Sequence, residues 1–225
     1  MATCFGALGD IHGDFASARA VIERHPDVPF WLCVGDLADD QGRYEPLPAP
    51  VHWIKGNNEN FDAVAEGVLP ANLHYLPNGA AAVIGGIRVA GLGGTFAPTW
   101  YETAAADLPH PRKASAKATE LADKRRHFVR QEVEACKASA PIDVLLTHEA
   151  PRPYFAGSGP RRNDAGKTPV NEVLDAIRPR LHLFGHHHRF TEQARHTVRS
   201  VGLDLVSRSY LLIDAATLEY EQRQT

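Results

Sequence analysis

Five short apolar segments of this chain each end at polar residues that bind metal ions well. These endings are Gly9-Asp10-Ile11-His12, Gly35-Asp36, Gly56-Asn57-Asn58, Thr147-His148 and Gly185-His186-His187-His188. Apolar runs of four to eight residues closed by a turn signal are typical of buried strands. In open α/β sheets, the loops that follow the strands line a common crevice. The pattern therefore predicts an α/β fold in which polar residues far apart in sequence meet.

The remaining segments favour strands that alternate with helices. We expect strands at residues 3–9, 28–34, 51–55, 73–76, 80–84, 87–92, 142–147 and 181–184, and three short ones between 192 and 220. We expect helices at 14–25, capped by Asp14, at 60–66, at 112–140, and from Pro169 to Ile177, where proline suits the first turn. Residues 95–111 have no clear hydrophobic periodicity, so we expect an irregular excursion there, before the long helix. This order of elements indicates an α/β sandwich.

Composition excludes several classes of protein. With 225 residues, 44% of them hydrophobic, the chain has the material for a single domain spanning residues 1–225, and it is neither disordered nor a disulfide scaffold. A net charge of −3 excludes a globally basic nucleic-acid binder. Three widely spaced cysteines, no signal-peptide pattern and no apolar run of about 18 residues predict a cytoplasmic protein with reduced thiols. We expect no membrane and no obligate protein partner.

The polar endings together contain one set of metal-binding side chains. The expected ligands are Asp10, His12, Asp36, Asn57, His148, His186 and His188. In Asp-x-His and His-x-His, the alternation of an extended backbone points both ligands the same way. Carboxylates and imidazoles without thiolates suit Mn²⁺, Fe or Zn²⁺ better than a closed cysteine site. Each short motif alone is more often a turn, so the prediction depends on all five occurring together at strand ends.

The combined pattern resembles the calcineurin-like metallophosphoesterase superfamily. Its signature runs Asp-x-His, Gly-Asp, Gly-Asn-His-Glu/Asp, His and Gly-His-x-His, and the likeness spans residues 9–188. The resemblance implies a four-layer αββα sandwich of two packed mixed β-sheets. It also implies two divalent metal ions, one held by Asp10, His12 and His188, the other by Asn57, His148 and His186, with Asp36 bridging both.

Four segments are also similar to the catalytic domain of RNA lariat debranching enzymes. These are residues 56–59, 87–96, 128–133 and 141–151. In the eukaryotic enzymes a cysteine replaces the first aspartate of the first motif, whereas Asp10 is intact here, which favours two occupied metal sites. Those enzymes also extend beyond the last motif, whereas this sequence stops soon after it. The substrate therefore does not follow from this likeness.

The resemblance implies hydrolysis of a phosphodiester. Two metals about 3.5–4 Å apart can clamp a phosphoryl group and deprotonate a bridging water. The expected partner is a phosphorylated substrate, with a nucleotide or RNA as candidates. The alternatives are a phosphomonoesterase acting on nucleotides or phosphoproteins, and a non-catalytic scaffold that keeps the fold.

Asn58 departs from the superfamily pattern at the position of the usual general-acid histidine. An amide cannot donate a catalytic proton, and general acid catalysis is typically worth about 10²–10⁴-fold. We therefore expect a preference for phosphodiesters or for good leaving groups. Candidate replacements for the acid are His52, His110 and His187, and candidate carboxylates for orienting the imidazoles are Asp39, Glu59 and Glu149.

Basic residues concentrate on both sides of His148. Residues 112–137 and 152–167 each contain more Lys and Arg than Asp and Glu. We expect Arg152, Arg161 and Arg162 to contact the substrate, together with Asn57 and Asn58. For the segment at 112–137, a solvated helix face with pairs such as Glu120–Lys124 is the alternative. Aromatic residues that either stack on bases or pack locally are Trp100, Tyr101, Tyr154 and Phe155.

Overall fold

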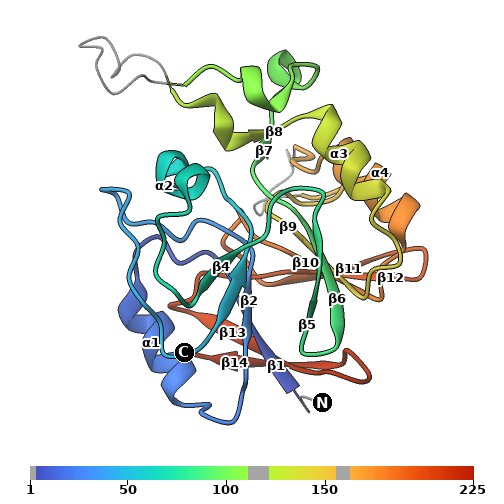
Figure 1. Ribbon diagram of the computed structural model, residues 1–225. Coiled ribbons are helices and arrows are strands. Elements are labelled where there is room, and N and C mark those ends of the chain that lie inside the picture. The colour runs from blue at the N-terminus through green and yellow to red at the C-terminus, as the bar shows by residue number, and fades with distance from the viewer. Residues whose placement is uncertain (1–3, 111–121, 156–162) are drawn as a thin grey trace.

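Two six-stranded β-sheets pack face to face in this computed structural model, which describes residues 4–110, 122–155 and 163–225 (Figure 1). The first sheet has the order β14-β13-β1-β2-β3-β4. Its strands are β1 (Cys4–Leu8), β2 (Trp31–Cys33), β3 (Val51–Trp53), β4 (Leu73–Tyr75), β13 (Ser209–Asp214) and β14 (Tyr220–Gln224). β1 to β4 run parallel, whereas β13 pairs antiparallel with β1 and β14 pairs antiparallel with β13.

The second sheet has the order β11-β12-β10-β9-β6-β5. Its strands are β5 (Ala81–Ile84), β6 (Ile87–Leu92), β9 (Val144–Thr147), β10 (Leu181–Phe184), β11 (Thr191–Arg195) and β12 (Val198–Gly202). Here β6, β9, β10 and β12 are parallel, and β5 and β11 are antiparallel edge strands. Both sheets are therefore mixed, as expected, but the C-terminal part contains four strands where the sequence predicted three.

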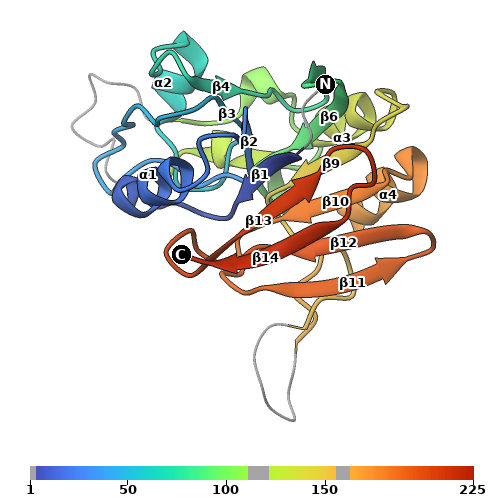
Figure 2. The ribbon, with the colours of Figure 1, turned by 90° about the horizontal axis from the view of Figure 1, so that it is seen from below.

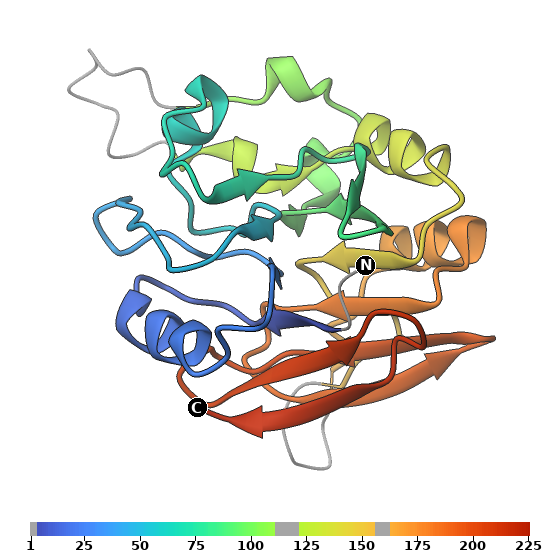
Figure 3. The ribbon, with the colours of Figure 1, turned by 60° about the horizontal axis from the view of Figure 1, so that its bottom comes forward.

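Helices cover the outer face of each sheet. α1 (Phe15–Glu23) and α2 (Phe61–Glu66) lie on the side of the first sheet, and α3 (Arg130–Lys137) and α4 (Thr168–Ile177) on the side of the second (Figures 1 and 3). Figure 2 shows the same arrangement from below, with β13 between β1 and β14. The four-layer αββα sandwich is thus confirmed. No helix in the described part of the chain is both long and apolar enough to cross a bilayer.

The alternation of side chains along each strand explains the four layers. In β1, Phe5 joins the core between the sheets, whereas Leu8 packs under α1. In β9, Val144 and Leu146 enter that same central core, whereas Leu145 packs against α3 and α4. Because successive strand residues point to opposite faces, a continuous apolar run supplies both layers at once. Full burial of each Leu, Val or Phe contributes about 1.5–3 kcal/mol.

Local signals determine where the helices begin. The Asp14 side chain accepts a hydrogen bond from the Ser17 amide at 3.1 Å and caps α1, as predicted. Asn60 caps α2 in the same way through the Ala63 amide. Pro169 occupies the first turn of α4, where its missing N–H costs nothing. These caps hold the helices that follow two of the ligand-bearing loops.

The predicted helix at 112–140 is wrong over residues 122–129. Residues 111–121 lie outside the described residues, but a 3₁₀ turn at Lys124–Arg126 and strand β8 (His127–Phe128) follow them, and α3 begins only at Arg130. Phe128 is fully buried, and β8 pairs with β7 (Thr95–Phe96), which keeps the backbone extended. The Glu132 side chain then accepts the Val129 amide at 2.9 Å and fixes the helix start. Tertiary burial therefore overrides the helix propensity of this segment.

Candidate metal centre

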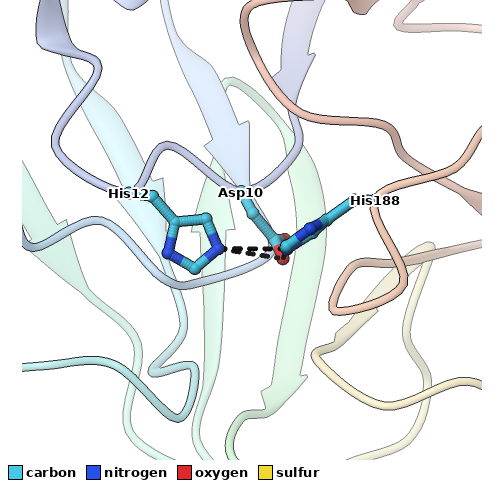
Figure 4. A group of neighbouring side chains, drawn as sticks. All are labelled: Asp10, His12 and His188. Atoms are coloured by element: carbon cyan, nitrogen blue, oxygen red, sulfur yellow. Dashed lines mark hydrogen bonds and ion pairs between the residues drawn. The ribbon is translucent and has the colours of Figure 1, made fainter.

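Asp10 and His12, from the loop after β1, and His188, from the loop after β10, converge onto one point (Figure 4). His12 Nε2 and His188 Nε2 are 3.0 Å apart, and His188 Nε2 lies 3.1 Å from Asp10 Oδ2. Two imidazole nitrogens that face each other at this distance repel unless a proton or a cation lies between their lone pairs. The donor set of one carboxylate and two imidazoles therefore fits a divalent cation such as Mn²⁺, Fe or Zn²⁺.

Asp36 connects this group to a second one. Its Oδ2 atom lies 3.5 Å from both His12 Nε2 and His148 Nε2. His148 is fully buried, and its Nδ1 donates to the Val34 carbonyl at 2.8 Å, which turns Nε2 toward Asp36 and toward Asn57 Oδ1 at 3.1 Å. A backbone carbonyl on one ring nitrogen is a typical way to orient a ligating histidine.

Both aspartates occupy shared positions in the cluster. Asp10 belongs to each of the two groups whose ligand atoms lie within 4.8 Å of one another, namely Asp10–His12–His188 and Asp10–Asp36–His148. The family resemblance implied that Asp36 alone bridges the two sites. His186 is placed beside this cluster, with its ring 4.9 Å from that of His148 and its amide donating to Asp10. The structure thus brings all seven predicted ligands together, and their roles as ligands stay a prediction.

Glycines before the ligands leave room for the cluster. A Cβ on Gly56 would lie 1.9 Å from Asp36 Oδ1, and one on Gly185 would lie 2.3 Å from Asp10 Oδ1. The ligand residues themselves are strained, since His12, Asp36 and His188 have φ of 48°, 51° and 49°. Such left-handed backbone in non-glycine residues persists only where the surroundings enforce it, and it concentrates at functional sites.

The electrostatics of the cluster favour a cation. Although burial alone raises the pKa of Asp36, the charge of His148 and hydrogen bonds from His148 and Asn58 lower it below its ordinary value. Burial lowers the pKa of His148, but Asp36 and Asp10 outweigh this effect and raise it to about 10. The two buried carboxylates therefore create a negative potential that stabilises positive charge at the imidazole nitrogens.

Glu59 fastens two ligand loops to each other. Its carboxylate accepts the amides of Leu37, Ala38 and Gly56 at 3.1, 3.4 and 3.2 Å, and the Tyr44 hydroxyl at 2.9 Å. The sequence suggested that Glu59 orients an imidazole, whereas it holds the backbone that follows Asp36 and precedes Asn57. Burial, followed by the charge of Asp36, raises the pKa of Glu59 to about 7.

The two other carboxylates suggested for orienting imidazoles have different contacts. Glu149 accepts the Phe96 amide at 3.1 Å and lies 3.7 Å from Lys167. Asp39 forms an ion pair with Arg43 at 2.7 Å. Both side chains therefore stabilise neighbouring loops.

A cavity of about 560 Å³ opens next to the cluster. His12, Asn57 and Asn58 line it, together with residues from the segment at 122–126, among them Arg125 and Arg126. No other described histidine lines this cavity. Its size suits a nucleotide-sized ligand.

The candidate replacements for the general acid have contacts elsewhere. The His52 ring stacks on His74 with centroids 4.7 Å apart, and the His187 ring stacks on Tyr154 at 4.3 Å. His110 lies near its own backbone, 3.1 Å from the Leu108 carbonyl. None of the three lines the cavity.

The predicted substrate contacts divide into three groups. Asn57 and Asn58 line the cavity, whereas Arg152 pairs with Asp164 at 2.7 Å and borders a separate, smaller one. Arg161 and Arg162 lie outside the described residues. Substrate contact by Arg152 therefore stays a prediction.

The aromatic residues suggested for base stacking mostly pack locally. Tyr101 is buried beside Phe96 and Phe128, and Tyr154 is buried against Phe184. Trp100 lies 5.9 Å from the Lys124 ammonium, and Phe155 is half exposed. Of these residues, none lines the large cavity.

Sequence reasoning missed Lys55, which connects the cluster to the segment at 122–128. Its ammonium is buried and donates to the carbonyls of Arg125 and His127 at 2.9 and 3.2 Å. The only sequence signal is a charged residue that directly follows an apolar strand and precedes Gly56-Asn57. A buried lysine needs hydrogen-bond acceptors, so a lysine at the end of a buried strand indicates that another segment supplies them.

Comparison with known proteins agrees with the geometry. A family model for calcineurin-like phosphoesterases matches residues 5–190. The lariat debranching enzyme of Schizosaccharomyces pombe is 25% identical over 210 residues, which cover 83% of this chain but only 44% of that enzyme. The chain therefore spans less than half the length of this curated relative.

Solved structures share the fold. The TT1561 protein of Thermus thermophilus superposes with a TM-score of 0.65 at 16% identity, covering 100% of this chain and 99% of that one. Phosphopantetheinyl hydrolase of Mycobacterium tuberculosis superposes with a TM-score of 0.52 at 15% identity, covering 92% of each chain. At these identities the likeness shows a common fold.

Proposed function

The chain belongs to the calcineurin-like phosphoesterase family, and from this premise we propose that it hydrolyses a phosphodiester with two divalent cations. The observation that carries the proposal is the convergence of two buried aspartates with His12, His148 and His188. Of these, Asp10, Asp36 and His148 are buried, and no apolar packing role explains the burial of such polar groups. Buried charges are costly unless they are paired or bind metal.

The proposed ligands divide the cluster into two sites. Asp10, His12 and His188 would hold one cation, and Asn57, His148 and His186 the other, with Asp36 between them. When bound, the cations would neutralise the phosphoryl oxygens and activate a water for attack. Mn²⁺, Fe and Zn²⁺ all suit these donors.

The residues of the chain fix the geometry that this reaction needs. The Val34 carbonyl holds the His148 ring in the orientation that presents Nε2 to the cluster. Asn58 holds both oxygens of Asp36, and Glu59 keeps the loops of Asp36 and Asn57 at a constant separation. Preorganised groups of this kind cost no rearrangement during the reaction.

The side chains around the cavity support a diester as the substrate. Hydrolysis adds water to phosphorus and breaks the bond to the leaving oxygen, which needs a proton if it is a poor leaving group. Asn58 cannot supply that proton, and His12 is the one histidine among the described lining residues. A phosphodiester with a stable leaving group avoids this need. The relative named as a lariat debranching enzyme supports a nucleotide or RNA as the substrate.

The test compares bis-p-nitrophenyl phosphate with p-nitrophenyl phosphate after chelation and re-addition of Mn²⁺. We expect the diester to have the higher kcat/KM. Both compounds release p-nitrophenolate, which needs little protonation, so the comparison tests the preference for a diester separately from general acid catalysis. A higher kcat/KM for the monoester would instead identify a phosphomonoesterase. Protein that bound no Mn²⁺ and hydrolysed neither compound would be a scaffold with this fold.

A further inference from the structure

Two neighbouring arginines that line the cavity beside the candidate metal centre differ in their carboxylate partners. The Arg125 guanidinium contacts Asp123 at 2.6 Å and Asp62 at 2.9 Å, so two carboxylates neutralise it. Arg126 forms no ion pair with any described residue, and its Nε atom is buried without a hydrogen-bond partner. Both arginines line the cavity together with His12 and Asn58. Among the described residues, Arg126 is therefore a cation without a carboxylate partner beside the candidate metal centre.

Lys55 fixes the backbone on both sides of Arg126. Its ammonium donates to the Arg125 carbonyl at 2.9 Å and to the His127 carbonyl at 3.2 Å. Lys55 itself directly precedes Gly56-Asn57, so the same residue determines where this turn lies relative to a ligand loop. Glu132 lies 3.7 Å from the Lys55 ammonium and balances its charge. The position of Arg126 is thus built into the fold.

The other charged residues that line the cavity are acidic or already paired, so an anion is expected to bind at Arg126. Asp39, Asp40, Asp62 and Asp123 also line it, and their carboxylates repel phosphate. Arg43 partners Asp39, and Arg125 partners Asp62 and Asp123. A guanidinium without a described carboxylate partner attracts an anion to its own position in a largely acidic wall. Its planar donors can also bind two phosphate oxygens at once.

We propose that Arg126 binds a second phosphate of the substrate, distinct from the one that is hydrolysed. The cavity of about 560 Å³ holds more than a single phosphoryl group, and Arg126 shares it with His12 of the candidate metal centre. The inference rests on the proposed phosphodiesterase function and deepens it, because it selects nucleotide substrates that carry a phosphate one nucleoside away from the scissile bond. Arg126 is then a specificity-determining residue.

The experiment uses two chromogenic diesters that differ in one phosphate. Thymidine 5′-(p-nitrophenyl phosphate) is compared with its 3′-phosphorylated counterpart, so that the scissile bond is the same in both. We expect Arg126→Gln to raise KM for the 3′-phosphorylated compound about tenfold, with kcat and the 3′-hydroxyl compound unaffected. Arg126→Lys keeps the charge but not the paired donors and recovers part of the loss. The control, Arg24→Gln, removes an exposed arginine that does not line the cavity.

Binding of thymidine 3′,5′-bisphosphate, measured by calorimetry, separates this inference from the proposed function. If the wild-type protein hydrolyses neither diester, the phosphodiesterase proposal fails, and an unchanged dissociation constant in Arg126→Gln overturns the role of Arg126 as well. Equal KM increases for both diesters, or none, also overturn it. If Arg126→Gln fails to fold, Arg126→Lys provides the same comparison.

Discussion

Asn58 donates two hydrogen bonds to Asp36, from its backbone amide to Oδ1 at 2.8 Å and from its side-chain amide to Oδ2 at 3.0 Å. Both oxygens of the central carboxylate are thereby held by one residue. The Oδ2 atom so oriented is the atom that lies 3.5 Å from both His12 and His148. Asn58 therefore positions the aspartate that connects the two groups of the cluster.

Asn58→Ala should weaken metal binding. The substitution keeps the backbone hydrogen bond to Oδ1 but removes the one to Oδ2, so the carboxylate can rotate away from the imidazoles. Loss of such an outer hydrogen bond typically costs about 10–100-fold in metal affinity. Calorimetric titration with Mn²⁺ measures the effect, and Asn78→Ala, which removes hydrogen bonds to the backbone of Gly93, is the control. An unchanged affinity would show that the side chain of Asn58 has no such role.

The ligand loops were predictable because their signals are local. A glycine before Asp36, Asn57 or His186 at the end of an apolar run is visible in a few residues, and the space that Gly56 and Gly185 leave explains why. Asn58 was recognised as a departure from the usual motif, but its two bonds to a residue 22 positions earlier were not predictable.

The unpredicted parts depend on contacts that are distant in sequence. Nothing within Lys124-Arg125-Arg126 shows which guanidinium reaches Asp123 and Asp62 and which has no described carboxylate partner, and Asp62 lies 63 positions before Arg125. The helix predicted at 112–140 failed for a related reason. Its composition, rich in Ala and charged residues and free of Gly and Pro, does not reveal that Phe128 is buried in a strand pair with β7.

Glu59→Gln should destabilise the metal-free protein. The carboxylate accepts three backbone amides and the Tyr44 hydroxyl, and an amide NH₂ in its place turns a donor toward other donors. Leaving one or two buried donors without acceptors costs about 2–4 kcal/mol of unfolding free energy. Tyr44→Phe removes the hydrogen bond donated to Glu59 and the one accepted from the Asn60 amide but turns no new donor toward the loops, so it should cost less, about 1–2 kcal/mol. Urea denaturation compares the two variants, and equal losses would contradict the clamping role of Glu59.

Metal ions should stabilise the fold through the cluster. A ligand that binds only the folded state adds about 2.7 kcal/mol to the unfolding free energy at one hundred times its dissociation constant. We expect Mn²⁺ to raise the melting temperature of chelator-treated protein, and Asp10→Asn to abolish most of this increase, because Asp10 belongs to both groups of ligands. Asp175→Asn, which affects an ion pair with Arg195, serves as the control. A similar increase in Asp10→Asn would indicate metal binding elsewhere.

His182 should make stability depend on pH. It is fully buried between the hydroxyls of Thr147 and Ser200, at 2.8 and 2.9 Å, and burial lowers its pKa to about 3. As the pH falls, the unfolded chain, with a histidine pKa near 6.5, binds the proton first. The contribution of neutral His182 to the free energy of unfolding is therefore complete above about pH 6.5 and is lost as the pH falls below it.

The measurement for His182 is the difference in unfolding free energy between the wild type and His182→Asn. Between pH 7.5 and pH 5 the wild-type advantage should shrink by about 2 kcal/mol, at about 1.36 kcal/mol for each pH unit below 6.5. Comparing two chains that share all other titrating groups cancels the contributions of those groups. A difference that stays constant over this range would mean that His182 is not held neutral in the folded state.

Asn58→His should change how the rate depends on the leaving group. The imidazole can donate a proton to the departing oxygen, which helps poor leaving groups far more than nitrophenolate. In a series of aryl methyl phosphodiesters, we expect the rate of the wild type to fall steeply as the leaving-group pKa rises and that of Asn58→His to fall more gently. Asn58→Gln, which keeps an amide, should retain the steep dependence. The two dependences are compared at saturating Mn²⁺, so that a weaker metal affinity does not imitate the effect. Parallel dependences in the wild type and Asn58→His would show that a residue at this position does not govern protonation of the leaving group.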